Sequence, residues 1–141
     1  MENRGTSAGF LLCKLGLAFA AVAFIGLALS MYSSSTRFAD REDLEMIASA
    51  VVSAIEKIEV FPGESELRRE LPASAQHYEI LIIGEMKDGL QIIQVCVASA
   101  AKVERSLIMS TTVNGGDFRL SMENPHEIVV GKSGTISVEL G

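Results

Sequence analysis

The sequence predicts an α+β protein, in which a long N-terminal hydrophobic helix of transmembrane length continues into an amphipathic helix. A small antiparallel β-sheet or sandwich of five to six strands follows as a head. Three observations lead to this class. Residues 15–32 form a run of 18 residues without a charge. Residues 44–58 carry apolar side chains at the spacing of one helical face. After Leu71 the apolar period changes to two and turn residues recur.

The apolar run is long enough to cross a bilayer, because 18 residues at about 1.5 Å each make a helix of about 27 Å. Adding residues 8–12 extends the stretch to 25 residues with one charge, Lys14, whose ammonium group can reach the lipid headgroups. Residues 33–36 are polar, and are either a break or a solvated turn of one long helix. We expect an apolar helix over residues 6–36, with the lipid bilayer as its partner.

The second helical segment is amphipathic. Its apolar stripe consists of Leu44, Ile47, Ala48, Val51, Val52, Ile55 and Ile58. Polar residues occupy the other face, and Phe61-Pro62-Gly63 ends the helix. We expect an amphipathic arm over residues 37–62 that covers one face of the sheet. The residues expected to pack on the head are Leu44, Ile47, Val51, Ile55 and Ile58.

The β-rich head is expected over residues 71–141. Its strands are predicted at residues 78–83, 90–98, 104–113, 118–122, 127–130 and 135–140. Turns are predicted at Lys87-Asp88-Gly89, Asn114-Gly115-Gly116, Asn124-Pro125 and residues 131–134. No helical crossover separates these strands, so the sheet should be antiparallel. The charged segment 64–70 is expected to be a solvated loop or a short helix.

Charge and cysteine content exclude several classes of protein. Only Arg4 and Lys14 of the 12 basic residues, and only Glu2 of the 18 acidic ones, precede Arg37, so the remainder carries a net charge of −7. Such a chain has no basic stripe for nucleic acid, which we exclude as a partner. Cys13 lies in the apolar segment and Cys96 in a predicted strand, so a disulfide scaffold is excluded. Both are expected to be small buried apolar residues.

The residue pattern predicts no catalytic chemistry. His77 and His126 have no Cys, Asp or Glu partners at metal-ligand spacing. The chain has no nucleophile elbow and no Gly-rich phosphate loop. We therefore expect no catalytic, cofactor-binding or metal-ligating residues, no cofactor and no enzymatic activity.

The charges that flank the apolar run predict its orientation. Arg4 and Lys14 precede it, whereas acidic residues dominate the segment after Arg37. This asymmetry favours a short cytoplasmic N-terminus and an exported C-terminal domain in the cell membrane. An alternative is a cleavable secretory signal, since Ala28-Leu29-Ser30 has the form of a signal peptidase site. That alternative would release a secreted β-domain.

The N-terminus carries a short motif. Arg4-Gly5 precedes Thr6, and the apolar helix follows at once. This arrangement resembles the prepilin leader of type IV pilin-like proteins, particularly that of archaeal pilins and archaeal flagellins. The resemblance implies that a prepilin-type peptidase removes residues 1–5 by cutting between Gly5 and Thr6. The apolar helix would stay in the mature chain.

The resemblance also implies a structural subunit, or a minor component, of an archaeal type IV pilus-like or secretion filament. Its partners would be other pilin-like subunits or an assembly platform. The residues expected to carry anchoring and assembly are Leu15, Gly16, Ala20, Ala23 and Gly26, because small residues let helices approach closely in lipid. One departure is Phe10, which stands where bacterial members carry a glutamate. A permanently anchored, single-pass envelope β-domain that acts as an accessory or binding module is the remaining alternative.

Overall fold

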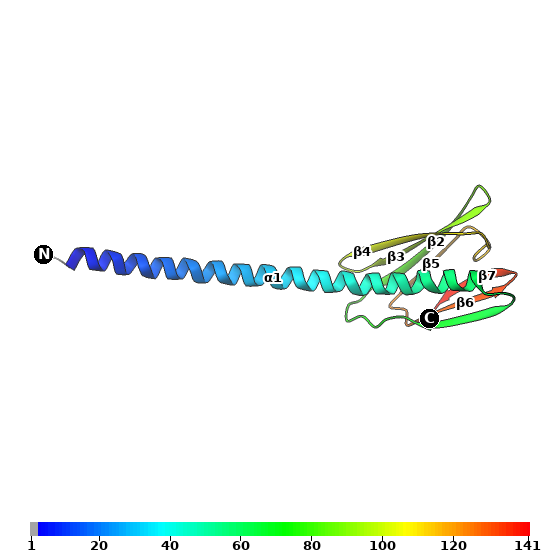
Figure 1. Cartoon of the computed structure of the whole chain (residues 1–141), viewed down its shortest axis with the longest axis horizontal. Coiled ribbons are helices and arrows are strands. Elements are labelled where there is room, and N and C mark those ends of the chain that lie inside the picture. The colour runs from blue at the N-terminus through cyan, green and yellow to red at the C-terminus, as the bar shows by residue number, and fades with distance from the viewer. Residues whose placement is uncertain (1–2) are drawn as a thin grey trace. The chain divides into compact units, whose positions relative to one another are not determined.

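The structure is a computed structural model that describes residues 3–141, with side chains from residue 7 onward. The described chain contains one helix and seven strands (Figure 1). They are α1 (Asn3–Val60), β1 (Ser65–Glu70), β2 (Glu79–Lys87), β3 (Leu90–Ala98), β4 (Lys102–Met109), β5 (Phe118–Glu123), β6 (Glu127–Ser133) and β7 (Thr135–Leu140). Contacts within the chain divide it into two units, residues 3–38 and Ala39–Gly141. A long apolar helix followed by a β-rich head confirms the predicted fold class.

Helix α1 passes through the polar residues 33–36 without a break. The Ser33 hydroxyl donates a hydrogen bond to the Ser30 carbonyl at 3.0 Å. The Thr36 hydroxyl lies 3.1 Å from the Tyr32 carbonyl and 3.0 Å from that of Ser33. These side chains bond to the backbone of the preceding turn, so the helix continues where a break was one of two expectations. It ends at Val60, just before the predicted Phe61-Pro62-Gly63 stop.

The head is built from two antiparallel sheets. One has the strand order β1-β6-β7 and the other β4-β3-β2-β5. Every pair of neighbouring strands is antiparallel, as the short connections predict. Residues 44–58 of α1 share one hydrophobic core with side chains of both sheets. This part of the helix belongs to the same unit as the sheets and covers them (Figure 1).

Strand β1 corrects the expectation for segment 64–70, which is neither a loop nor a short helix. Ser65, Leu67 and Arg69 are half-buried and alternate with exposed charged residues. Leu67 pairs with Val130 of β6. The segment contains one apolar residue, so a period of two is invisible in its sequence. Pairing with β6 makes it an edge strand, and charged side chains are common on such edges because they discourage further pairing.

The turn at Asn114-Gly115-Gly116 is present, with φ angles of 46°, 80° and 117°. It does not close a hairpin, because it connects β4 and β5, which form opposite edges of the four-stranded sheet. The buried side chain of Gln91 holds this crossing. Its Nε2 donates to the Val113 carbonyl at 2.9 Å and to the Gly116 carbonyl, and its Oε1 accepts from the Val113 amide at 2.6 Å.

Strand β2 must approach this crossing closely. A Cβ atom at Gly84 would collide with the ring of Phe118 and would lie 2.8 Å from Gln91 Nε2. Glycine is therefore required here for space. The β2–β3 hairpin turns at Asp88 and Gly89, whose φ angles are 53° and 79°, as the predicted Lys87-Asp88-Gly89 turn requires.

Candidate functional site

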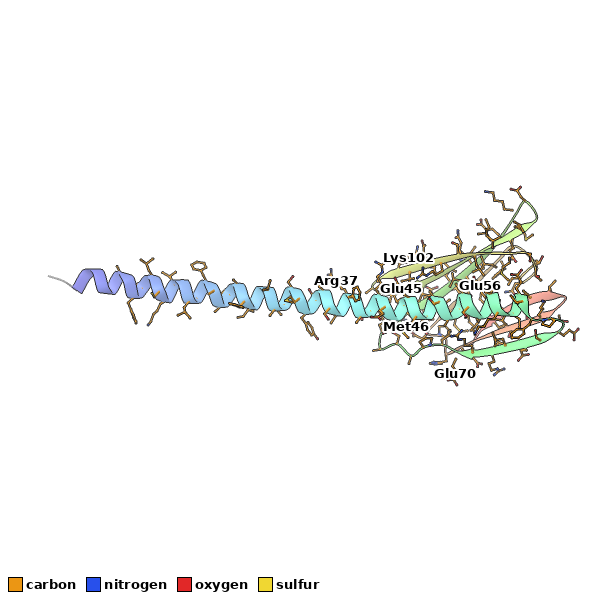
Figure 2. All side chains as sticks on the ribbon, viewed as in Figure 1. Arg37, Glu45, Met46, Glu56, Glu70 and Lys102 are labelled. Atoms are coloured by element: carbon orange, nitrogen blue, oxygen red, sulfur yellow. The ribbon has the colours of Figure 1, made fainter. Side chains whose placement is uncertain are left out.

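The N-terminal part of α1 carries a continuous apolar surface. Every residue from 7 to 39 is exposed. Side chains project from all sides of this helix (Figure 2). Among the large ones, Leu17 is 73% exposed and Phe24 is 72% exposed. By length and composition this helix can cross a membrane. An exposed apolar surface of this extent requires lipid or another protein against it.

The residues predicted for anchoring and assembly, Leu15, Gly16, Ala20, Ala23 and Gly26, all lie on this exposed surface. Gly16, Ala20 and Ala23 follow the i, i+4, i+7 spacing of one helical face. A Cβ atom at Gly16 or Gly26 would have nothing within 4 Å. These small residues therefore form a shallow, uncovered face that a second helix could approach.

Two positively charged residues mark the ends of the charge-free part of this surface. Lys14 lies one turn after Phe10, and its Nζ is 4.6 Å from the centre of the Phe10 ring. At this distance the ammonium group interacts with the face of the ring. Arg37 is the first charged residue after Lys14, and it is labelled in Figure 2.

The second part of α1 places its predicted apolar stripe in the core of the head. Leu44, Ile47, Val51, Ile55 and Ile58 are all 0% exposed. The opposite face stays in solvent, with Met46 54% exposed (Figure 2). This segment of α1 is thus part of the core of the head. Detaching it would expose the apolar side chains of that core to water.

The C-terminal end of α1 is held by two side chains. Glu59 Oε1 accepts hydrogen bonds from the Ser110 amide at 2.9 Å, the Ser110 hydroxyl at 2.7 Å and the Thr111 amide at 3.1 Å. Lys132 Nζ donates to the carbonyls of Glu59 and Phe61, both at 2.9 Å. The lysine therefore satisfies carbonyl groups that a helix end leaves unpaired.

These contacts set the charge state of Glu59. Partial burial alone would raise the pKa of this carboxyl group, but the hydrogen bonds from Ser110 and Thr111 and the positive charge of Lys132 outweigh it. The net result is a pKa below the ordinary value of 4.5. Sequence reasoning missed both residues, because Glu59 and Lys132 are 73 positions apart.

The histidines lie beside a hollow of about 430 Å³ between residues 71–78 and 124–126. His77 Nδ1 contacts the Asn124 side chain, and His77 Nε2 lies 3.7 Å from a carboxylate oxygen of Glu123. Tyr78 also lines the hollow, and its hydroxyl donates a hydrogen bond to the Pro125 carbonyl at 2.7 Å. Burial raises the pKa of that hydroxyl. Among the described residues, no group of three His, Cys, Asp or Glu side chains could hold a metal ion.

The two cysteines have different surroundings. Cys96 is half-buried in β3, and burial raises the pKa of its thiol. Cys13 is exposed on α1, so the expectation that both are buried is wrong for Cys13. It shares the exposure of all residues from 7 to 39.

The predicted processing site, Gly5 and Thr6, lies in the first turns of α1. The exposure and contacts of both residues fall outside the described part of the chain. Comparison of the chain with protein-family models, with curated proteins and with solved structures finds no match.

Proposed function

We propose that this protein is a membrane-anchored, pilin-like structural subunit or minor component of an archaeal type IV pilus-like or secretion filament. In this proposal residues 6–36 anchor the chain before assembly and pack against other subunits afterwards. The exported β head provides the outward contacts. The proposal rests on two observations. One is the resemblance of the Arg4-Gly5 leader to prepilin leaders. The other is that the first part of α1 is exposed whereas the second part packs in the head.

The difference in exposure between the two parts of α1 is the structural observation that supports the proposal. Within one uninterrupted helix, Asn3–Val60, residues 7–39 are exposed and mostly apolar, whereas the apolar stripe of residues 44–58 is buried in the head. A signal sequence or a plain anchor needs no helix that continues into the core of its domain. A filament subunit would use both parts of the helix, the apolar residues for packing between subunits and residues 44–58 for packing within the head.

Processing at Gly5 tests the proposal. The mature protein, isolated from the membranes of its native host, is expected to begin at Thr6 by intact mass and N-terminal sequencing. Gly5→Val should block this processing, because glycine allows the close backbone approach that a peptidase needs. Gly9→Val is the matched control, since it adds the same side chain one turn later, where a Cβ atom has open space.

Other N-termini would contradict the proposal. An intact Met1 in the mature protein would indicate a permanently anchored envelope β-domain. A start at Met31 would indicate a secreted domain released after Ser30. Normal maturation of the Gly5→Val chain would remove the support of the leader.

A further inference from the structure

We infer that residues 15–36 are the part of α1 that lies in the hydrocarbon of the bilayer, and that Lys14 and Arg37 bracket it by binding lipid phosphate groups in the two leaflets. The inference deepens the proposed function and rests on its membrane-anchoring part. It differs from a placement centred on the longer apolar stretch of the sequence, residues 8–32 (the hydropathy placement), which would leave Lys14 inside the hydrocarbon.

The first argument is length. Residues 15–36 are 22 positions without a charge, all within one helix. At about 1.5 Å per residue they span about 33 Å, close to the hydrocarbon thickness of about 30 Å. Residues 8–32 would span about 38 Å and would include one ammonium group, which is costly near the centre of a bilayer.

The second argument is the state of the hydroxyl groups after Tyr32. The Ser33 hydroxyl donates a hydrogen bond to the Ser30 carbonyl, and the Thr36 hydroxyl donates to the Tyr32 and Ser33 carbonyls. A hydroxyl group without a partner is expensive in an apolar medium, but one that is bonded to the helix backbone is tolerated. Ser33 and Thr36 therefore need no water. Ser34 and Ser35, within the described part of the chain, make no side-chain hydrogen bond, but each hydroxyl can reach a carbonyl of the preceding turn by rotation about χ1, so the boundary can lie at Arg37.

The third argument is the direction of the Lys14 side chain. Its Nζ lies over the ring of Phe10, one turn towards the N-terminus. Long helical side chains point in this direction, so the ammonium group is carried away from residues 15–36 and towards the headgroups. A lipid phosphate is the group of opposite charge at that level of the membrane.

The two placements differ in a measurable way. The centre of residues 15–36 lies about 8 Å along the helix from the centre of residues 8–32. In the inferred placement Cys13 is about 19 Å from the bilayer centre and Ser34 about 13 Å. In the hydropathy placement the order is reversed, with Cys13 at about 10 Å and Ser34 at about 21 Å.

Nitroxide depth measurements on the full chain distinguish them. Cys96→Ser leaves the native Cys13 as the single labelling site, and Cys13→Ser, Cys96→Ser and Ser34→Cys together give the second site. Each labelled chain is placed in vesicles of phosphatidylcholine and phosphatidylglycerol, with a water-soluble nickel chelate on both sides and oxygen as the apolar quencher. We expect the label at Cys13 to be the more accessible to nickel. A label at position 34 that is more accessible would overturn the inference.

Substitution of Lys14 tests its role directly. Lys14→Leu should let the helix slide, so that the accessibility order of positions 13 and 34 reverses. Lys14→Arg keeps the positive charge and should keep the order. An unchanged order in the Lys14→Leu chain would show that Lys14 does not set the boundary, and would overturn the inference.

Failure of the inference and failure of the proposed function are separable. If the chain does not float with vesicles in a density gradient, both membrane anchoring and the boundaries at Lys14 and Arg37 are wrong. If it floats but shows the opposite depth order, only the boundaries at Lys14 and Arg37 are wrong. Processing at Gly5 is measured in the native host and does not depend on either depth result.

Discussion

At the scale of single residues, a few polar side chains hold segments that are distant in the sequence. Gln91 binds the loop that crosses from β4 to β5. Asn114 pairs with Val138 of β7 as a neighbouring strand would, since its side-chain oxygen accepts from the Val138 amide at 2.9 Å and its Nδ2 donates to the carbonyl at 3.2 Å. Glu59 links the end of α1 to residues 110 and 111. Each replaces a regular backbone partner where the chain turns.

Glu59 should make the stability of the head depend on pH. Its folded-state pKa lies below 4.5, so its contribution is present above the unfolded-state pKa and is lost as the pH falls through the folded value. We expect Glu59→Gln to lower the free energy of unfolding at neutral pH by about 1 kcal/mol at most, because solvent screens this partly exposed group. The difference from the original chain should shrink in acid.

Thermal unfolding in detergent, followed by circular dichroism across this pH range, measures the effect. Glu56→Gln is the control, since Glu56 is exposed and lies one turn earlier on the same helix. Equal pH dependence in the Glu59→Gln chain and the original chain would refute the role assigned to Glu59.

At the scale of elements, α1 serves two environments along one continuous backbone. From Ser7 to Phe38 its side chains are exposed whether they are large or small. From Leu44 to Ile58 the apolar stripe packs against both sheets. Strand β1 also contacts this part of the helix, because the Arg69 guanidinium donates a hydrogen bond to the Ser53 hydroxyl at 3.3 Å. Helical periodicity therefore matters only in the second part, where one face meets protein and the other meets water.

The same substitution should destabilise the head in the second part of α1 and leave the head unaffected in the first. Ile55 is 0% exposed and Ile25 is 61% exposed. Ile55→Ala should reduce the free energy of unfolding by about 2–5 kcal/mol, because it leaves a cavity in the core. Ile25→Ala should leave the unfolding of the head unchanged in detergent. Chemical denaturation of both variants provides the comparison, and similar losses would argue against the assignment of two environments.

At the scale of the whole molecule, the hydrophobic core is contained in residues 44–140 of the described chain. It combines α1 side chains with side chains from both sheets. The apolar surface of residues 7–38 contributes nothing to that core. Folding of the head therefore does not depend on the apolar surface of residues 7–38, and contact of that surface with lipid would be governed by a different part of the sequence.

A fragment of residues 39–141 should accordingly fold without detergent. We expect a soluble monomer with cooperative thermal unfolding and no binding to vesicles, whereas the full chain should require detergent or lipid. Sedimentation velocity, circular dichroism and vesicle flotation test this. Aggregation of the fragment would mean that the head needs the first part of α1 to fold.

Much of the fold could be predicted because its signals are local. The charge-free run of residues 15–32 specifies an apolar helix by length, and the spacing of Leu44, Ile47, Val51, Ile55 and Ile58 specifies a buried face. Alternation of apolar residues and the turn at Asp88-Gly89 specify β2 and β3. At the candidate site, the exposed apolar helix and the buried stripe of α1 could both be predicted from such local signals. The roles of Gly5 and Thr6 remain predictions, based on a short motif.

Other features depended on contacts between distant residues. Segment 65–70 has one apolar residue and becomes a strand only by pairing with β6, more than fifty positions later. The contacts of Glu59 with Lys132 and of Gln91 with Val113 likewise join residues far apart in the chain. The sequence by itself determined the helical and apolar segments and most of the extended ones, because propensity and periodicity act over a few residues. Only the tertiary structure decided the order of the strands, the place of β1 and the partners of buried polar groups, because these follow from which surfaces meet when the core closes.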